Sequence, residues 1–390
     1  MDTIVVAGAG HAGTRLAAAL RESGYSARLV LAGEEPGLPY RHPPLTKNYL
    51  GGELEEDELH FHPATFYRDN GIELINQRVA GIDRAGRAVR LADGQALGYD
   101  HLVLATGARN RRLGVAGDDL RGVLSLRTRQ EAAALRGALA TAKDIVVVGA
   151  GFIGMEFAST ANRLGHRVTI VETLDRPMAR LVSPQSGRRF TTLHELNGNR
   201  LIFGNGVVRL HGDPEGRVRA VELDDGTRLP ADLVLVAVGV TPETGLARAA
   251  GLDVADGVVV DEYLLTSDPH ISAIGDCAAF PHEGRRIRRE SVQNALDHAG
   301  LVAARLTGSR QPYGKIPWFW TEQFDWTLQI AGHPDGHTAS ELHESAGGVF
   351  SHQLYQGRRL IAVESLNLPD DHFAALQKLS DAGEPILEAG

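Results

Sequence analysis

The stretch DIVVVGAGFIGMEFASTANRLGHRVTIVE, residues 144–172, decides the fold that the sequence predicts. It begins with an apolar run at 145–148, of the kind that forms a buried parallel strand. The glycine-rich turn GAGFIG follows, then a helical segment and a second apolar run that ends at Glu172. The order of strand, turn, helix, strand and acid is typical of a dinucleotide-binding Rossmann unit.

The same pattern occurs a second time, in TIVVAGAGHAGTRLAAALRESGYSARLVLAGEE at residues 3–35. In such a unit the first glycine makes the tight turn, the second lets the backbone approach a pyrophosphate, and the third lets the helix pack against the strand. The helix N-terminus then offers N–H groups to the phosphates, and the acid accepts hydrogen bonds from a ribose. The glycines concerned are Gly8, Gly10, Gly13, Gly149, Gly151 and Gly154. The sequence therefore predicts two dinucleotide sites.

The bulk composition narrows the class of protein. A length of 390 residues exceeds one ordinary core, so two or three domains are expected. The net charge of −9 argues against nucleic-acid or anionic-membrane binding. No apolar run reaches the roughly 18 residues of a membrane helix, and a first strand near Thr3 leaves no room for a signal peptide. We expect a cytoplasmic protein without a metal site.

Further segments indicate that the same order of elements, a Rossmann unit, an antiparallel hairpin and a returning strand, occurs twice in the chain. Residues 99–113 and 231–242 each look like a buried strand that follows a polar, hairpin-like stretch. Another strand, at 271–274, ends where Gly275 and Asp276 can meet a ligand. We predict two doubly wound α/β domains, the second inserted into the first, with boundaries at 1–112 plus 242–312 and at 113–241. Residues 313–390 are expected to form an α+β domain with two strands around a Gln356–Gly357 turn and a final amphipathic helix.

Six segments carry a family resemblance that runs from residue 3 to about residue 367. They are LPYRHPPLTKNYL, LATGARNRRL, VVVGAGFIGMEFA, TSDPHISAIGDCA, RRESVQNALDHA and PWFWTEQFD. The chain resembles the FAD-dependent, NADH-using ferredoxin reductases of bacterial oxygenase and P450 systems. These form a branch of the pyridine nucleotide-disulphide oxidoreductase superfamily that lacks redox cysteines. The resemblance implies glutathione-reductase-type domains, with FAD in the first, NAD(H) in the second, and an interface role for the third.

The resemblance also implies site residues. The implied FAD-binding residues are Gly8, Gly10, His11, Ala12, Gly13, Glu34, Glu35, His42, Lys47, Val79, Thr106, Gly107, Arg111, Gly275, Asp276, Ser291, Val292, Gln293 and Trp320. The implied NAD(H)-binding residues are Gly149, Gly151, Phe152, Ile153, Gly154, Glu156, Glu172 and Gly239. Glu34 is the expected ribose ligand of FAD, with Glu35 as the alternative. His42 stands where the family usually has arginine, which predicts a weaker or pH-dependent phosphate contact.

Two of these residues are expected to be catalytic. Lys47 matches the family lysine beside the flavin N5, where a cation stabilises the negative charge of reduced flavin. A buried ammonium needs a partner, and Glu156 is the candidate. The helix start at Val292 and Gln293 is expected to stabilise the other side of the reduced ring. On the NADH side, Glu172 is expected to favour a free 2′-hydroxyl over a 2′-phosphate, a preference that nearby Arg176 could soften.

The cysteine count limits where the electrons go next. Residues 34–54 contain no cysteine, and the single Cys277 is expected to be a buried, inert thiol, so thiol outlets are excluded. A one-electron iron–sulfur protein is the best remaining acceptor, with an acidic [2Fe–2S] ferredoxin ahead of rubredoxin. The basic run EGRRIRRE, residues 283–290, would either dock that partner or form an ordinary solvated loop.

Two other functions remain open at this point. One is an NADH-dependent quinone or oxygen reductase. A membrane-attached quinone reductase usually needs a basic amphipathic C-terminal helix, and the short acidic tail here counts against it. The other is a redox-sensing interaction protein like apoptosis-inducing factor.

Overall fold

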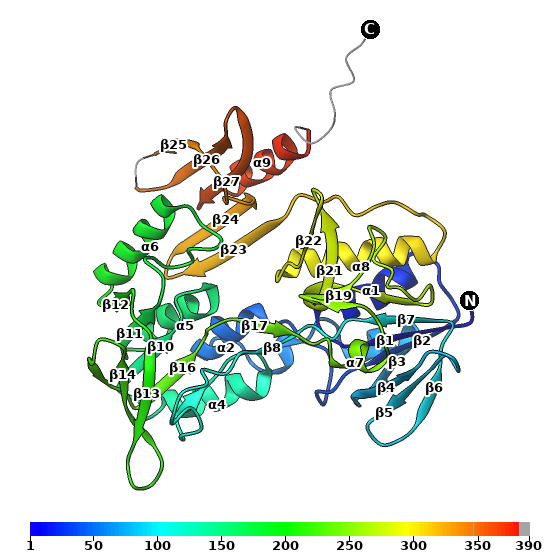
Figure 1. Cartoon of the computed structure of the whole chain (residues 1–390), viewed down its shortest axis with the longest axis horizontal. Coiled ribbons are helices and arrows are strands. Elements are labelled where there is room, and N and C mark those ends of the chain that lie inside the picture. Colours follow the sequence, from blue (N-terminus) through cyan, green and yellow to red (C-terminus); the bar gives the residue numbers. More distant parts are fainter. Residues whose placement is uncertain (346, 382–390) are drawn as a thin grey trace. The chain divides into compact units, whose positions relative to one another are not determined.

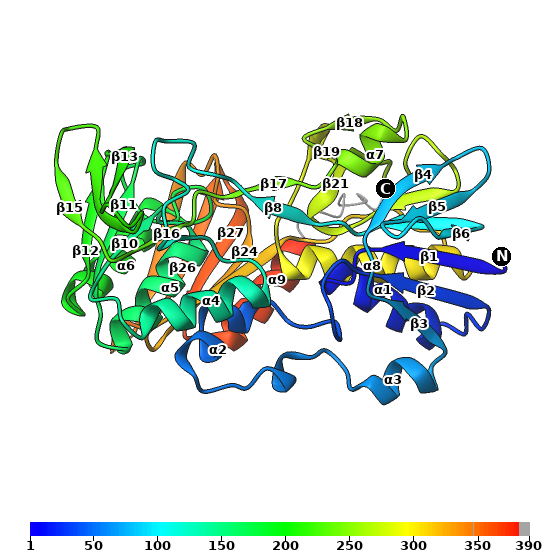
Figure 2. The same cartoon turned by 90° about the horizontal axis from the view of Figure 1, so that it is seen from below.

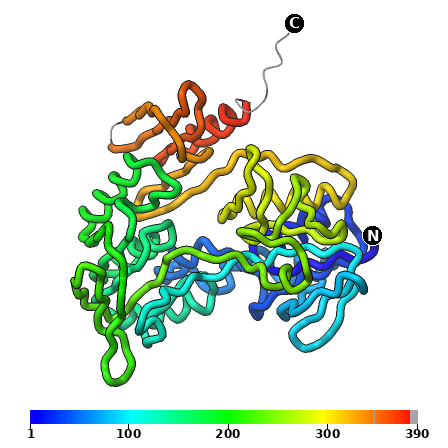
Figure 3. Tube along the Cα trace, viewed as in Figure 1, coloured from blue at the N-terminus to red at the C-terminus, as the bar shows by residue number. Residues whose placement is uncertain are grey.

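The computed structural model describes residues 1–345 and 347–381. The chain divides into two compact units, which are described separately. The first unit comprises Met1–Arg41, Glu56–Arg109 and Thr241–Lys315, and the second comprises His42–Glu55, Asn110–Val240 and the chain from Ile316 onward. In the colours of Figure 3, the first unit takes blue and yellow-green segments, and the second takes mainly green and orange ones.

The first unit is built on a parallel sheet of five strands in the order β20-β7-β1-β2-β3. Strands β7, β1, β2 and β3 of this sheet are labelled in Figure 1. Its strands are β1 (Thr3–Ala7), β2 (Arg28–Ala32), β3 (Ile72–Ile75), β7 (His101–Leu104) and β20 (Ile271–Ala273). The central strand β1 has neighbours on both sides, and its residues 4–6 are fully buried. That burial explains why the sequence shows a continuous apolar run here rather than an alternating one.

Helices α1 (His11–Glu22) and α8 (Val292–Leu306) pack against each other in this unit (Figure 2). An antiparallel sheet is formed by β4 (Val79–Asp83), β5 (Ala88–Leu91) and β6 (Ala96–Gly98). The remaining elements are η2 (Asp57–Leu59), α3 (Ala64–Asp69), α7 (Gly245–Ala249), β18 (Val254–Ala255), β19 (Gly257–Val259), η3 (Gly275–Cys277), β21 (Ala278–His282) and β22 (Arg285–Ile287). Two of the points at which the chain passes from one unit to the other lie in the short strands β8 (Ala108–Asn110) and β17 (Val240–Pro242).

The second unit repeats the parallel plan, with the strand order β12-β11-β10-β16-β9. These strands are β9 (Val123–Leu124), β10 (Asp144–Val148), β11 (Arg167–Glu172), β12 (Arg200–Phe203) and β16 (Leu233–Val236). Its helices are α4 (Arg129–Leu139), α5 (Phe152–Arg163) and α6 (Pro184–Leu196), and its small antiparallel sheet is β13 (Val207–Gly212), β14 (Val218–Leu223) and β15 (Arg228–Pro230). Both units thus combine a Rossmann-type sheet with an antiparallel excursion, as the sequence predicted.

The second unit also contains the C-terminal antiparallel sheet, in the order β23-β24-β27-β26-β25. The strands are β23 (Trp318–Gln323), β24 (Trp326–Gly332), β25 (Ala339–Glu344), β26 (Phe350–Gln356) and β27 (Arg359–Leu366). Helix α9 (Pro369–Asp381) covers one face and buries Ala375 and Leu379 against Ala331 and Val363. The predicted hairpin around Gln356 and the predicted final helix are both present.

The remaining short elements, η1 (Pro43–Thr46) and α2 (Asn48–Gly51), also belong to the second unit. The compact units therefore group residues 42–55 and the C-terminal sheet with the second parallel sheet. The three-domain boundaries given above stay a prediction. Across residues 1–345 and 347–381, no helix is long and apolar enough to cross a membrane.

Candidate active site

The two glycine turns share one geometry. A Cβ built on Gly8 would lie 2.1 Å from the carbonyl oxygen of Ala105, and one built on Gly149 would lie 2.4 Å from that of Ala237. Both glycines also have a positive φ, +120° and +102°. In each unit the turn therefore runs against the backbone that follows a neighbouring strand, and only glycine fits there.

The helices that follow these turns lack side-chain caps. The N-cap residues of α1 and α5 are Gly10 and Gly151, and neither provides a capping hydrogen bond. By contrast, Thr128, Ser183 and Ser291 cap α4, α6 and α8 with their hydroxyl oxygens. A Cβ on Gly151 would meet nothing within 4 Å, so open space adjoins the start of α5. Uncapped N–H groups facing a glycine turn suit a pyrophosphate, so both sites fit a dinucleotide.

In the first unit, several predicted FAD-binding residues come together at the carboxyl ends of neighbouring strands. Thr106 and Gly107 follow β7, while Gly275 and Asp276 follow β20, which pairs with β7. A Cβ on Gly275 would lie 3.1 Å from the Cβ of Ala12, so η3 reaches the start of α1. This is the sheet edge at which open α/β folds bind ligands.

The acidic candidates for the FAD ribose differ in their surroundings. Glu34 is exposed, and its Oε1 lies 3.9 Å from Nε of Arg78. Glu35 accepts a 2.6 Å hydrogen bond from the hydroxyl of Tyr40. Because the Glu35 carboxylate already has a close partner, Glu34 stays the preferred ribose ligand, as a proposal.

The start of α8 and the first residue of β4 complete the first unit's candidates. Ser291 Oγ accepts from the N–H of Asn294 at 3.1 Å, and Val292 and Gln293 follow as the first residues of the helix. Val79 is buried at the start of β4. The role of each toward FAD stays a prediction. Four further predicted FAD contacts, His42, Lys47, Arg111 and Trp320, belong to the second unit, so the structure does not group them with these residues.

The NAD(H) candidates lie together in the second unit. Glu172, the last residue of β11, accepts from the N–H of Ala150 at 2.8 Å and from that of Leu174 at 2.9 Å. Phe152 and Ile153 form the first turn of α5, and Ile153 is exposed although it is apolar. The last candidate, Gly239, follows the end of β16 with an open surrounding.

Arg111 and Arg176 each donate hydrogen bonds within the second unit. Arg111 Nε donates to the Val240 carbonyl at 2.9 Å. Arg176 donates to Asp175 at 2.9 Å and to the Ala179 carbonyl at 3.1 Å. These two contacts hold the Arg176 guanidinium, and its effect on a 2′-phosphate stays a prediction.

The predicted ion pair between Lys47 and Glu156 is confirmed. Lys47 Nζ lies 3.3 Å from Glu156 Oε1 and 3.7 Å from Glu322 Oε2. Glu156 lies on α5 and is only 5% exposed. Lys47 Nζ also lies 5.8 Å from the ring centre of Trp320, within the range of a cation–π contact. A lysine, a buried carboxylate and an aromatic ring therefore form one cluster.

Sequence reasoning missed three further contacts of the Glu156 carboxylate. Thr46 Oγ1 donates to Oε2 at 2.7 Å, and Thr321 Oγ1 donates to Oε1 at 2.9 Å. The N–H of Glu322 reaches Oε1 at 3.4 Å. Thr46 and Thr321 each adjoin a residue that was singled out, Lys47 and Trp320, but nothing in the local pattern shows that their hydroxyls converge.

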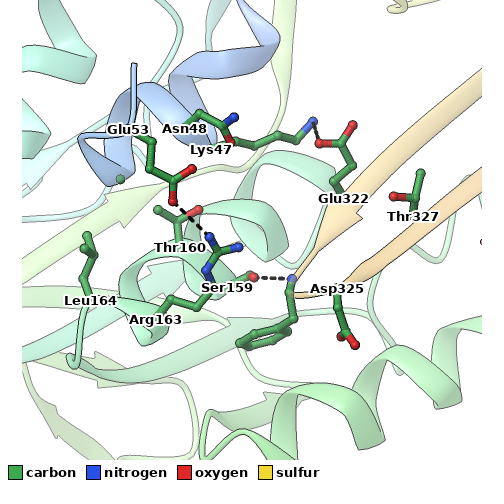
Figure 4. Close-up of a pocket in the computed structure, with 12 residues that line it drawn as sticks. Lys47, Asn48, Glu53, Ser159, Thr160, Arg163, Leu164, Glu322, Asp325 and Thr327 are labelled. Carbon is green, nitrogen blue, oxygen red and sulfur yellow. Dashed lines mark hydrogen bonds and ion pairs between the residues drawn. The ribbon is translucent and has the colours of Figure 1, made fainter. Parts of the chain in front are cut away.

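Lys47 also lines a pocket of about 320 Å³ (Figure 4). Its wall includes Glu322, Asp325, and the pair of Arg163 with Glu53, whose N–O distance is 3.2 Å. Figure 4 shows Lys47 reaching toward Glu322 along this wall. The ammonium thus lies between a buried carboxylate and a half-exposed one.

Cys277 has no route to solvent. It is fully buried, its thiol lies 3.3 Å from the Ile274 carbonyl oxygen, and burial raises the pKa of this thiol. The expected burial of this thiol is confirmed. A buried protonated thiol is a poor nucleophile and a poor electron acceptor.

The basic run at residues 283–290 is only partly a surface feature. Arg285 and Arg286 are exposed, but the side chain of Arg288 is 7% exposed and pairs with Glu290 at 2.6 Å. Arg289 is 8% exposed and lies over the ring of Phe280. Two of the four arginines are therefore unavailable to a docking partner, which corrects the view of this run as one charged patch.

Comparison with known proteins covers almost the whole chain. A family model described as "Pyridine nucleotide-disulphide oxidoreductase" matches residues 2–299, and one described as "Reductase C-terminal" matches residues 318–389. Over 382 residues the chain is 45% identical to rhodocoxin reductase of Rhodococcus erythropolis, covering 97% of this chain and 89% of that protein.

Solved structures of similar reductases match the fold of almost the whole chain. The crystal structure of the ferredoxin reductase for the CYP199A2 system from Rhodopseudomonas palustris matches with a TM-score of 0.94 and 48% identity, over 96% of this chain and 93% of that one. The covalent putidaredoxin reductase–putidaredoxin complex matches with a TM-score of 0.94 and 37% identity, over 98% of this chain and 93% of that one.

Proposed function

The chain belongs to the pyridine nucleotide-disulphide oxidoreductase family, and from that premise we propose that it is a ferredoxin reductase. It takes a hydride from NADH onto bound FAD and passes single electrons to an acidic [2Fe–2S] ferredoxin. Support for the partner comes from relatives that are named as ferredoxin reductases or were solved with putidaredoxin.

One observation carries the proposal: two dinucleotide turns share a chain whose single cysteine is buried. The turns give places for a flavin nucleotide and a nicotinamide nucleotide. The disulphide branch of the family passes electrons to a thiol pair, which this chain lacks. Electrons that enter at one nucleotide site must therefore leave to an external acceptor.

FAD, when bound, supplies a group that accepts two electrons together and releases them one at a time. The residues of the protein would orient FAD and set the electrostatic field around its ring. The start of α1, with Gly8, Gly10 and Gly13, would hold its pyrophosphate, and Glu34 its ribose. Lys47, held by Glu156, would provide positive charge, and the first N–H groups of α8 would stabilise negative charge.

The second site is proposed to hold NADH rather than NADPH. The start of α5 would bind the pyrophosphate, and the Glu172 carboxylate would accept from the ribose hydroxyls. A 2′-phosphate at this place would meet that carboxylate and be repelled. Support comes from Arg176, whose guanidinium is held by Asp175 and the Ala179 carbonyl.

The experiment is a spectroscopic titration of the purified protein. We expect a yellow protein with FAD bound, bleached by NADH under anaerobic conditions, that then reduces a [2Fe–2S] ferredoxin. Rubredoxin and a soluble quinone serve as comparison acceptors. A colourless protein that cannot be reconstituted with FAD would contradict the proposal, as would faster turnover with quinone than with ferredoxin.

A further inference from the structure

Glu156 stands at the end of a chain of buried hydrogen bonds that crosses the second unit. Thr321 Oγ1 donates to Glu156 Oε1 at 2.9 Å, and Gln323 Nε2 donates to Thr321 Oγ1 at 3.0 Å. The Oε1 of Gln323 lies 2.9 Å from Nε2 of His194, and Nδ1 of His194 lies 2.9 Å from Nδ2 of Asn199. Thr321, Gln323 and His194 are fully buried. Three elements, β23, α6 and the turn after α6, thus reach one carboxylate.

The direction of every bond in this chain follows from the charge of Glu156. An ionised carboxylate can only accept, so the Thr321 hydroxyl must donate to it. The hydroxyl oxygen then accepts from the amide group of Gln323, whose carbonyl is left facing His194. His194 must donate through Nε2, and its Nδ1 accepts from Asn199. All donors therefore point toward Glu156.

His194, at the end of the hydrogen-bond series away from Glu156, is neutral and held in place. Burial lowers the pKa of His194 to about 4, against an opposing effect of its hydrogen bond to Gln323, so the ring carries no charge at neutral pH. His194 lies near the end of α6, whose first turn is held by Glu364 through the N–H and hydroxyl of Ser183. The position of the His194 ring in the hydrogen-bond series is therefore fixed by the attachment of α6.

We propose that Thr321, Gln323 and His194 are positioning residues that hold the Glu156 carboxylate aimed at Lys47. The inference rests on the proposed function only for the role of that ion pair toward FAD. A donor that is itself hydrogen-bonded is more polarised, so each link strengthens the bond to the carboxylate. The charged groups around Glu156 are Lys47 and, through Lys47, Glu322. Thr321, Gln323 and His194 can position Glu156 in this way without contacting the cofactor themselves.

The first test compares Thr321→Val with Thr321→Ser in the FAD-loaded protein. Valine keeps the shape of the buried side chain but removes the hydroxyl, whereas serine keeps the hydroxyl. We expect Thr321→Val to slow flavin reduction by NADH roughly tenfold, while Thr321→Ser stays near the parent rate.

A second readout does not depend on activity. The sequence contains four lysines, Lys47, Lys143, Lys315 and Lys378, so reductive ¹³C-methylation gives few NMR signals. The Lys47 signal, assigned by its loss in Lys47→Arg, reports the contact of Nζ with the Glu156 carboxylate. We expect Thr321→Val to move that signal toward the position of a solvent-exposed lysine, because the carboxylate has lost a donor that holds it in place.

Whether Gln323 acts through Thr321 is tested by Gln323→Met and by the double variant that combines it with Thr321→Val. If Gln323 acts through Thr321, Gln323→Met shifts the Lys47 signal in the same direction by less. Adding it to Thr321→Val then produces no further shift, because the link is already broken. Additive shifts would overturn the proposal.

A matched control separates positioning from docking of α6. Arg189 also ties this helix to the C-terminal sheet, through Glu344 at 2.7 Å, but takes no part in the chain. Arg189→Ala should leave both the flavin reduction rate and the Lys47 signal unchanged. A parent-like Lys47 signal in Thr321→Val, or an equal shift in Arg189→Ala, would overturn the inference. A protein without bound FAD would refute the proposed function instead, and the Lys47 signal would still test the hydrogen-bond network.

Discussion

The carboxylate of Glu172 accepts a hydrogen bond from the backbone N–H of Ala150, at 2.8 Å. The acid at the end of β11 is therefore fastened to the glycine turn that follows β10. Its other oxygen accepts from the N–H of Leu174. A carboxylate held at both oxygens is oriented before any ligand arrives, which makes it an effective specificity determinant for a ribose.

We predict that Glu172→Ser reduces the preference for NADH over NADPH by at least about tenfold, because it removes the charge that repels a 2′-phosphate. The measurement is kcat/KM for both nucleotides with one ferredoxin. Glu172→Gln is the matched control for structure, since its amide oxygen can still accept from Ala150. An unchanged preference in both variants would place the specificity determinant elsewhere.

The ion pair of Lys47 and Glu156 yields a second prediction. Replacing either residue by alanine should slow flavin reduction by NADH about tenfold or more while FAD stays bound, because the charge near the ring is lost or misplaced. Stopped-flow absorbance measures the rate, and the spectrum of the purified variant reports bound FAD. Glu322→Gln is the control, because Glu322 is half-exposed and 3.7 Å away, so its loss should change the rate less than about twofold. Parent-like rates in both alanine variants would refute the assigned role.

The attachment of α6 provides a third prediction. Glu364 is fully buried and accepts from the N–H of Ser183 at 2.5 Å and from the hydroxyls of Ser183 and Ser186. Glu364→Ala strands these donors, so hydrogen exchange of α6 should accelerate by an amount equivalent to about 3 kcal/mol. Arg189→Ala breaks a more exposed tie and should cost less than about 1 kcal/mol. If Glu364→Ala and Arg189→Ala accelerated hydrogen exchange of α6 equally, the buried hydrogen bonds of Glu364 would not hold this helix more strongly than the more exposed ion pair of Arg189.

Much of the fold follows from local sequence signals. The strand expected near Thr3 is β1, and the apolar run at 145–148 is β10, which begins one residue earlier. Both were predictable because a buried parallel strand and its glycine turn are recognisable within a few consecutive residues. The partner of Lys47 was also predicted, because a buried ammonium requires a carboxylate and the family resemblance indicated Glu156. The polar chain beyond it was not, because Gln323 and His194 are 129 positions apart. No local pattern records which distant polar groups meet.

Buried histidines give a prediction about pH. Burial lowers the pKa of His298 to about 3, with a further lowering by Arg289, while an unfolded histidine titrates near 6.5. Below pH 6.5 the unfolded chain binds a proton that the folded chain does not, so this residue makes stability fall as pH drops from 6.5 toward 3. In His298→Gln the drop in melting temperature from pH 7 to 4.5 should be smaller by about 5 °C. Glutamine can still accept from the N–H of Gly275, so an unchanged drop would mean that other groups control acid unfolding.

The exposed half of the basic run gives the last prediction. Arg285 and Arg286 are free to face a partner, whereas Arg288 is occupied by Glu290 and Asp256. If an acidic ferredoxin approaches this hairpin, the pair Arg285→Glu and Arg286→Glu should raise its KM roughly fivefold and weaken the dependence of the rate on salt, with flavin reduction by NADH unchanged. Arg288→Gln should instead lower thermal stability with little effect on the salt dependence, because it removes an internal ion pair. A parent-like KM after the double charge reversal would exclude this hairpin as the docking surface, since a steering patch cannot lose two charges without changing the encounter rate.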